Sequence, residues 1–219
     1  MILPQFIDIH THKTGQAPKG ELRILNIHEN FSQLDKQCLY SFGLHPWYLD
    51  NHEINFLALK EFATAANVAA IGECGLDRVC STDWSVQKSV FAQQLELAEA
   101  LSKPVIIHCV RAYEDVLSML EGVKKPNSVV FHGFNRNVQL ARKIVSRGHY
   151  LSFGAGILKN SSVQKAFNLT PMEKIFFETD NSDIQINRIY EKAAEIKDTS
   201  IEDIILQVQQ NFDKVFIVV

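Results

Sequence analysis

Histidines and carboxylates recur in this sequence at one kind of position, directly after a short apolar run. His10 and His12 end the segment FIDIHTH, and residues two apart in a strand point to the same face. The other members of the set each end a further apolar run: Glu73, His108, His132 and Asp180. Any one of these histidines could be a hydrogen-bonded core residue. Four histidines with two carboxylates instead predict a site for divalent metal, because imidazoles and carboxylates suffice to bind such ions without thiolates.

This mixture of ligands predicts two divalent ions, Zn²⁺, Mg²⁺ or Mn²⁺, and a hydrolytic reaction. Glu73 can bridge two cations through its two carboxylate oxygens while the imidazoles complete each coordination sphere. Two cations roughly 3.5–4 Å apart can share a water molecule, lower its pKa and stabilise the attacking and leaving oxygens. Asp180 can ligate one cation and accept the proton of that water, so we expect it to be the general base. Asp180 and Glu73 are therefore the predicted catalytic residues.

A scaffold for these residues must bring the ends of several strands together. Apolar, β-branched runs predict strands over Phe6–His10, Arg23–Ile27, Leu39–Leu44, Val68–Gly72, Val105–Cys109, Ser128–Phe131, Tyr150–Phe153 and Lys174–Glu178. Helical periodicity predicts helices over Glu53–Ala66, Ser85–Leu101, Ala112–Gly122, Val138–Arg147, Ser162–Asn168, Arg188–Lys197 and Ser200–Phe216.

Apolar strands that alternate with helices favour an α/β fold with a buried parallel sheet. A compact (β/α)8 TIM barrel fits best, since its active sites lie at the carboxyl ends of the strands. The first βα unit is expected to be shortened, because only KTGQAPKGEL separates His12 from Arg23. A doubly wound open sheet is the alternative. The 219 residues contain no repeat or linker, which predicts a single domain over residues 1–219.

Composition limits the classes of protein that need to be considered. With 46% hydrophobic and 21% charged residues, the chain is typical of a globular protein. The net charge of −3 and the absence of a basic run give no support for a protein that grips duplex DNA over many phosphates. The start MILPQFIDIH has neither a basic segment nor a long apolar run, so we expect no signal peptide, no membrane span and a cytoplasmic protein. The four cysteines form no CxxC pair and are expected to be reduced.

Seven motifs in order resemble those of one protein family. FIDIHTH, SFGLHPWY, AAIGECGLD, PVIIHC, VVFHGF, YLSFGAG and FFETD, from Phe6 to about Asp183, are similar to the motif series of the TatD-type metal-dependent deoxyribonucleases and hydrolases, within the amidohydrolase-like barrels. The resemblance implies that the six residues named above are metal ligands. It also implies that His45 of the GLHP motif contacts a substrate phosphate, and that the reaction is metal-dependent hydrolysis of phosphodiester bonds, often in DNA.

Two basic positions depart from that family pattern. Members usually carry an arginine two residues after the fifth-strand histidine, where this chain has Val110, with Arg111 one residue later. The sixth-strand motif usually continues Phe-Ser-Gly, whereas here it continues Phe-Asn-Arg and ends at Arg136. We expect His45, Arg111 and Arg136 to bind the substrate phosphate, since fixed positive groups stabilise charge on phosphoryl oxygens.

Other polar and aromatic residues near these motifs have two interpretations each. Asp8 is expected to form core hydrogen bonds rather than bind metal. Asp77 could orient a ligand histidine or substrate, or cap a turn. Trp47 and Tyr48 follow His45 and could line a pocket for a base or pack beneath the loop.

Three functions follow from these residues. The first is a phosphodiesterase or deoxyribonuclease that acts on short or single-stranded DNA. The second is a hydrolase of a small phosphoester, or of another ester or amide, on the same scaffold. The third is a non-catalytic barrel that binds a partner, and the intact ligand set argues against it. The expected partner is therefore DNA or a small phosphoester substrate, and the sequence indicates no protein partner.

Overall fold

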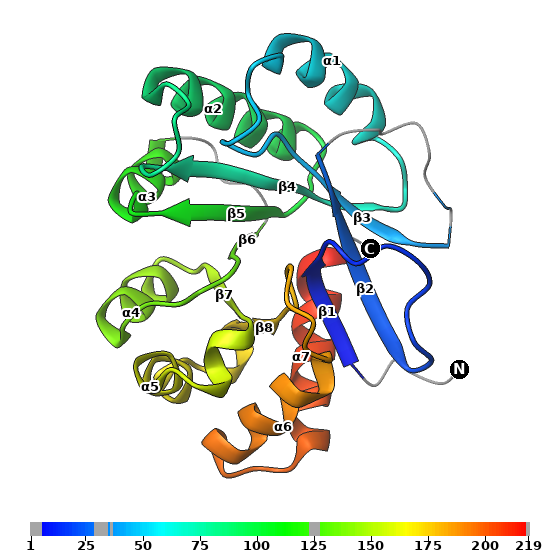
Figure 1. Ribbon diagram of the computed structural model, residues 1–219, viewed down its shortest axis with the longest axis vertical. Coiled ribbons are helices and arrows are strands. Elements are labelled where there is room, and N and C mark those ends of the chain that lie inside the picture. The colour runs from blue at the N-terminus through cyan, green and yellow to red at the C-terminus, as the bar shows by residue number, and fades with distance from the viewer. Residues whose placement is uncertain (1–5, 29–34, 36, 123–127, 218–219) are drawn as a thin grey trace. The chain divides into compact units, whose positions relative to one another are not determined.

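The strands and helices of the chain follow the predicted alternation (Figure 1). The computed structural model describes residues 6–28, 35, 37–122 and 128–217. The strands are β1 (Phe6–Thr11), β2 (Glu21–Ile27), β3 (Leu39–Phe42), β4 (Val68–Asp77), β5 (Val105–Val110), β6 (Val129–Phe131), β7 (Tyr150–Phe153) and β8 (Ile175–Phe177). The helices are α1 (His52–Phe62), α2 (Trp84–Ala100), α3 (Tyr113–Gly122), α4 (Val138–Ser146), α5 (Ser161–Leu169), α6 (Ile186–Lys197) and α7 (Ile201–Phe216). Short 3₁₀ turns lie at Ala155–Leu158 and Met172–Lys174.

The strand order confirms the predicted fold class. The sheet has eight strands in the order β1 to β8, and the strand pairings described are parallel. Thr11 forms a parallel bridge with Asp180, beyond the end of β8, so the last strand returns to the first. This is the connectivity of a (β/α)8 barrel. The first unit is shortened as predicted, because residues 12–20 contain no helix.

One predicted strand boundary is wrong. Glu73 was expected to end its strand, but β4 continues to Asp77. The pairing of β4 with β5 shifts register between Gly72 and Cys74, which is a bulge in the middle of the strand. Glu73 therefore sits at an irregularity inside β4, and Asp77 is the residue at the strand end.

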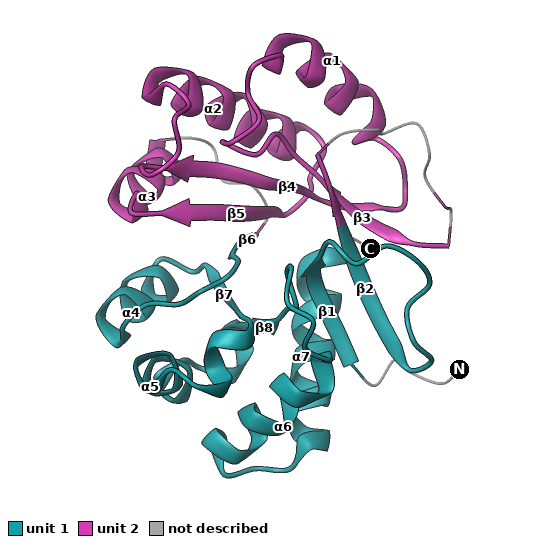
Figure 2. Ribbon diagram, viewed as in Figure 1, with its two compact units in different colours: residues 1–25, 131–217 teal, residues 26–130, 218–219 magenta. Residues whose placement is uncertain are grey.

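The chain divides into two compact units (Figure 2). Unit 1 comprises residues 1–25 and 131–217, and unit 2 comprises residues 26–130 and 218–219. The single domain over residues 1–219 stays a prediction. Among the described residues, no helix combines the length and apolar character needed to span a membrane.

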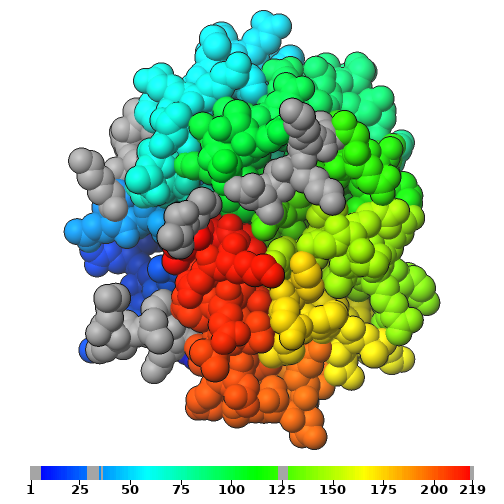
Figure 3. Space-filling view, turned by 180° about the vertical axis from the view of Figure 1, so that it is seen from behind, coloured from blue at the N-terminus to red at the C-terminus, as the bar shows by residue number. Residues whose placement is uncertain are grey.

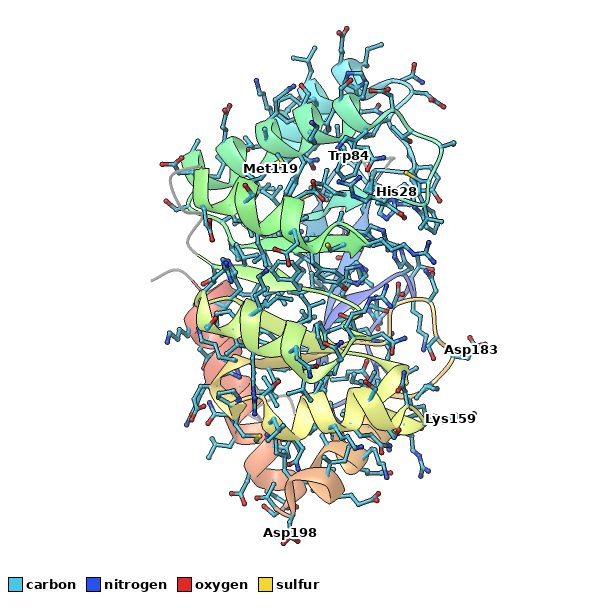
Figure 4. The ribbon with its side chains drawn as sticks, turned by 90° about the vertical axis from the view of Figure 1, so that its left-hand side faces the viewer. His28, Trp84, Met119, Lys159, Asp183 and Asp198 are labelled. Carbon is cyan, nitrogen blue, oxygen red and sulfur yellow. The ribbon has the colours of Figure 1, made fainter. Side chains whose placement is uncertain are left out.

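Aromatic side chains dominate the core of unit 1. Phe153, Phe167 and Phe177 are fully buried and pack ring to ring. Tyr190 of α6 lies against Phe177, and its hydroxyl bonds to both the backbone N–H and the carbonyl of Ile7, so α6 is fixed to β1. Helices α6 and α7 lie side by side, as the orange and red surfaces of Figure 3 show. Lys159 and Asp183, which follow β7 and β8, lie on the same side of this unit in Figure 4.

The core of unit 2 is formed by β3, β4 and β5 with α2 against them. Val90, Phe91 and Leu95 of α2 are buried at helical spacing, as predicted. The same helix buries two glutamines, Gln87 and Gln94, which a core helix tolerates only when their amides are hydrogen-bonded. Both amides bind the backbone of residues at the candidate site described next.

Candidate active site

In unit 1, the predicted ligands from β1 and β8 lie together. The Nε2 atoms of His10 and His12 lie 3.8 Å and 3.5 Å from Oδ1 of Asp180. The backbone N–H of Asp180 donates to the His10 carbonyl at 2.9 Å, which holds this carboxylate beside the two imidazoles. Asp180 adopts a left-handed conformation with φ of 49°, a conformation that aspartate tolerates better than most residues. Two imidazole nitrogens facing one carboxylate oxygen fit a divalent cation.

The third predicted ligand histidine of unit 1, His132, is oriented by a carboxylate that the sequence analysis missed. The ring of His132 lies 4.3 Å from that of His10 between centroids. Its Nδ1 faces Oε1 of Glu178 at 3.3 Å, and the same oxygen accepts the Gly133 N–H at 2.7 Å. Burial raises the pKa of Glu178, but the charge and hydrogen bond of His132, with His10 and Ser152, outweigh it and lower the pKa overall. An ionised Glu178 accepts the Nδ1 proton, so Nε2 of His132 is left to bind a metal.

Glu178 could have been found from the sequence. It lies two residues before Asp180 in FFETD, as a carboxylate at the end of an apolar run. That is the same signal that identified Asp180.

Asp8 forms core hydrogen bonds, as predicted. It is fully buried, and it accepts bonds from the backbone N–H of Thr179 at 3.0 Å and from the Thr179 hydroxyl at 2.6 Å. Burial raises the pKa of Asp8 to about 7 despite these bonds. Asp8 thereby holds the residue that precedes Asp180.

In unit 2, Glu73 lies between two histidines. Its Oε1 is 2.7 Å from Nδ1 of His108 and 3.3 Å from Nε2 of His45. The ligand atoms of these three residues all lie within 4.8 Å of one another, which fits a metal ion. Asn26, which the sequence analysis missed, accepts the Glu73 backbone N–H at 2.7 Å. Its signal in the sequence was an amide side chain within the apolar segment of β2.

The hydrogen bonds of the two histidines in unit 2 give them different roles. Nε2 of His108 faces the carboxylate of Asp77 at 3.2 Å, and Nδ1 faces that of Glu73 at 2.7 Å. A proton on Nε2, donated to Asp77, would leave Nδ1 as the ligand atom when a cation is bound beside Glu73. Nδ1 of His45 instead accepts the backbone N–H of Trp47 at 3.1 Å. A neutral His45 then carries its proton on Nε2, which lies 3.3 Å from Oε1 of Glu73 and would act as a donor in this state. This pattern supports His45 as a phosphate contact.

Asp77 both orients a histidine and caps a turn. Its Oδ2 accepts the indole N–H of Trp47 at 2.7 Å, and its Oδ1 accepts the Val79 N–H at 2.7 Å. Burial raises the pKa of Asp77, but the hydrogen bonds from Trp47, Val79 and His108 outweigh it, so the pKa is lowered. Asp77 thus stays ionised and accepts from both aromatic rings.

Helix α2 fixes the backbone of both site loops in unit 2. The amide of Gln94 accepts the Leu44 N–H at 2.7 Å and donates to the Leu44 carbonyl at 3.1 Å, immediately before His45. Gln87 makes the same pair of bonds to the backbone of Asp77, at 2.9 Å and 3.1 Å. Gly75 lets β4 approach β5, because a Cβ there would lie 2.0 Å from the His108 carbonyl oxygen.

The two arginines predicted to bind phosphate lie at the surface of their units. Arg111 is exposed directly after β5, in a left-handed conformation with φ of 53°. Arg136 is exposed in the loop after β6. A third arginine, Arg78, is paired with Asp115 at 2.8 Å and covers the ring of Trp84 at 4.1 Å. The phosphate-binding role of Arg111 and Arg136 therefore stays a prediction.

Comparison with known proteins shows the family. The sequence model described as TatD related DNase matches residues 9–217. An uncharacterized metal-dependent hydrolase of Buchnera aphidicola is 29% identical, over 86% of this chain and 80% of that protein. The uncharacterized metal-dependent hydrolase YjjV of Escherichia coli is 30% identical, over 84% and 82%. The 3'-5' ssDNA/RNA exonuclease TatD of Cronobacter turicensis is 32% identical, over 65% of this chain and 57% of its own length.

Solved structures agree with the fold. The crystal structure of YjjV, a TatD homolog from Escherichia coli, superposes with a TM-score of 0.86 at 23% identity, covering 100% of both chains. A TatD family hydrolase of Entamoeba histolytica superposes with a TM-score of 0.78 at 16% identity, covering 99% of both chains. Strand order, the grouping of histidines with carboxylates in each unit, and the match over residues 9–217 lead to one conclusion: the chain belongs to the TatD family of metal-dependent hydrolases.

Proposed function

We propose that this protein is a divalent-metal-dependent phosphodiesterase that acts on single-stranded DNA. The observation that carries the proposal is the position of Glu73 Oε1, between the imidazoles of His108 and His45. A carboxylate with one histidine on each side would hold a divalent cation beside a possible hydrogen-bond donor, which suits hydrolysis of a charged ester. The Cronobacter relative is named as a 3'-5' ssDNA/RNA exonuclease, which supports the same substrate class.

The proposed ligands are the six residues of the sequence analysis: His10, His12, Glu73, His108, His132 and Asp180. Within unit 1, Asp180 lies beside His10 and His12, and this supports these three as ligands. Within unit 2, Glu73 lies beside His108, and this supports that pair. Each of the six residues lies at or near the carboxyl end of a strand, the end at which TIM-barrel active sites are built, and this supports its role as a ligand. When bound there, two divalent ions would lower the pKa of a water molecule and offset charge on the phosphoryl oxygens.

Residues of this chain would accept and donate the protons of the reaction and position the reacting groups. Asp180 would accept the proton of the attacking water, since its carboxylate is partly exposed beside two ligand histidines. His45 would donate its Nε2 proton to a phosphoryl oxygen, an arrangement that stabilises developing negative charge. Glu178, Asp77 and Asp8 would hold these groups in place through the bonds described above.

A hydrolase of a small phosphoester is the second candidate. It is favoured by the exposed positions of Arg111 and Arg136 and by the net charge of −3, since a long polyanion needs more fixed positive charge. A small substrate would need only His45 and the metal ions.

One experiment separates the two candidates. Protein loaded with Zn²⁺, Mg²⁺ or Mn²⁺ would be assayed on a single-stranded oligonucleotide and, in parallel, on small phosphomonoesters, carboxylic esters and amides. The Asp180→Asn variant, purified in the same way, controls for contaminating nucleases. Metal-dependent cleavage of the oligonucleotide that Asp180→Asn lacks supports the nuclease. Turnover of small phosphoesters alone would favour the second candidate, and turnover of none would contradict both.

A further inference from the structure

Two aromatic side chains beside the site are exposed to solvent. Trp47 and Tyr48, directly after His45 and Pro46, have 53% and 52% of their surface exposed. Large aromatic side chains contribute most to stability when buried. Adjacent exposed rings at a site therefore point to a binding role more than to packing.

The indole of Trp47 is held in one orientation. Its Nε1–H donates to Asp77 at 2.7 Å, and its backbone N–H donates to His45 at 3.1 Å. The only polar atom of the side chain is thus used inside the protein, and what remains for a ligand is the π face. A ring fixed in this way loses little conformational entropy when a planar group stacks on it.

Trp47 adjoins the residues proposed to act on the phosphodiester. Its ring centroid lies 4.9 Å from that of His45, with the planes at 84°, and 6.0 Å from that of His108. A planar group on the indole would therefore lie beside the imidazoles that flank Glu73.

Tyr48 borders this surface rather than extending it. Its ring is 6.3 Å from Trp47 at an angle of 77°, so the two planes are nearly perpendicular. One face of Tyr48 is covered by His28, labelled in Figure 4, whose ring stacks on it at 4.9 Å and 16°. The pair therefore presents an indole that is half exposed to solvent, with a second ring at its margin.

We propose that Trp47 is a stacking site for the nucleobase next to the scissile phosphodiester, with Tyr48 at its border. The proposal rests on the proposed function, and it names the part of the substrate that the site recognises. Because Nε1 is committed to Asp77, binding relies on stacking and not on hydrogen bonds to base edges. Stacking of this kind tolerates every base, since each has a π face.

Binding of two DNA strands that differ only in their bases tests the proposal. The Asp180→Asn variant loaded with Mn²⁺ would be titrated with a single-stranded oligonucleotide and with the same strand made abasic. In this background, Trp47→Leu removes the π face, Trp47→Phe keeps an aromatic face, and both lose the bond to Asp77. Leu57→Ala, which truncates an exposed apolar side chain of α1, is the matched control.

We expect Trp47→Leu to weaken binding of the normal strand by about 5- to 150-fold, the range for one stacked base. Trp47→Phe should recover much of that loss, whereas the abasic strand should bind all four proteins with similar affinity. Unchanged binding of the normal strand to Trp47→Leu, or an equal loss for the abasic strand, would overturn the proposal. Circular dichroism of each variant shows whether the fold is intact.

Fluorescence gives a second measurement that does not depend on a Trp47 variant. Trp84→Phe leaves Trp47 as the sole tryptophan, because the chain has two. The normal strand should change Trp47 emission, and the abasic strand should not; equal responses would contradict stacking.

Hydrolysis by the wild-type protein separates this proposal from the proposed function. If neither strand is cleaved but only the normal strand quenches Trp47, the stacking site stands and the nuclease fails. If both strands are cleaved and Trp47→Leu binds normally, the nuclease stands and the stacking site fails.

Discussion

The hydrogen-bond partners of single histidines decide what each can do. His132 directs Nδ1 at Glu178, whereas His108 lies between two carboxylates, with Nε2 toward Asp77 and Nδ1 toward Glu73. In each case a carboxylate orients the ring, as partners of ligand histidines do. His45 accepts a backbone N–H instead and has a proton to donate. These differences cannot be seen in the motifs, where every histidine follows an apolar run.

Asp180→Asn tests the general base. Asparagine keeps the shape and one carbonyl oxygen, so at least one ion should remain bound, but it cannot accept a proton from water. We expect turnover to fall by about 10²–10⁴-fold. Metal content is measured alongside the kinetics, and Asp183→Asn in the same loop is the matched control. Turnover near that of the wild type would show that Asp180 is not the general base, and Glu73 would then be the next candidate.

His45→Ala tests whether this histidine is a donor or a ligand. If it donates to phosphate, kcat should fall by about 10²–10³-fold while the bound metal is unchanged. Elemental analysis of the dialysed variant decides the point. Loss of an ion would make His45 a ligand, as its distance from Glu73 also permits.

At the scale of elements, α2 and β4 position the site in unit 2. A helix of 17 residues presents Gln87 and Gln94 on its buried face, seven residues apart and thus two turns along it. Each amide satisfies one N–H and one carbonyl of a site loop. The loops are therefore fixed by the helix rather than by their own sequence.

Gln94→Leu should disturb this arrangement. It leaves the Leu44 N–H and carbonyl without the bonds to Gln94, at about 1–3 kcal/mol each, so we expect a loss of about 2–6 kcal/mol in the free energy of unfolding. Chemical denaturation measures it, with Gln93→Leu on the neighbouring position as control. Equal stability of the two variants would show that the Leu44 backbone finds other partners.

Lys103, which binds backbone carbonyls just after α1, should make the free energy of unfolding depend on pH. Its ammonium donates to the carbonyls of Ala63, Ala65 and Val68, and burial lowers the pKa of Lys103 to about 8. Between pH 8 and 10.5 the unfolded chain binds more protons at this residue, so its contribution to stability rises with pH. We expect a gain of about 1–2 kcal/mol, reduced from the full shift by solvent contact.

The measurement compares unfolding of the wild type and Lys103→Met across that pH range. Their difference should change with pH, whereas the exposed Lys88→Met should track the wild type. A constant difference would show that Lys103 keeps its ordinary pKa in the fold.

At the scale of the whole molecule, metal ions and folding should be linked. Buried carboxylates and imidazoles in both units favour the folded chain more when a cation satisfies them. We expect Zn²⁺ at about 100 times its dissociation constant to stabilise the fold by about 2.7 kcal/mol, and a chelator to reverse this. Thermal unfolding with and without chelator measures the effect. An unchanged midpoint would contradict metal binding by the folded state.

Substitution of two residues sharpens that test. Glu73→Gln should abolish most of the gain, because this carboxylate is a proposed ligand and glutamine carries no charge. Glu53→Gln, at the first turn of α1, should keep it. Equal gains for both variants would place the ion elsewhere.

The sequence by itself determined the fold class and the candidate ligands. Hydrophobic periodicity and composition suffice for the fold class, because a parallel barrel needs continuous apolar strands. Histidines and carboxylates at the ends of such strands suffice for the candidate ligands, because active sites of barrels are built there. The tertiary structure decided what depends on neighbours distant in the chain. It extended β4 to Asp77, paired His132 with Glu178, and showed that Asn26 and Gln94 bind the site backbone. The paired residues are 46, 47 and 50 positions apart along the chain, so no local pattern could indicate them. Only the packed units bring their atoms within hydrogen-bonding distance.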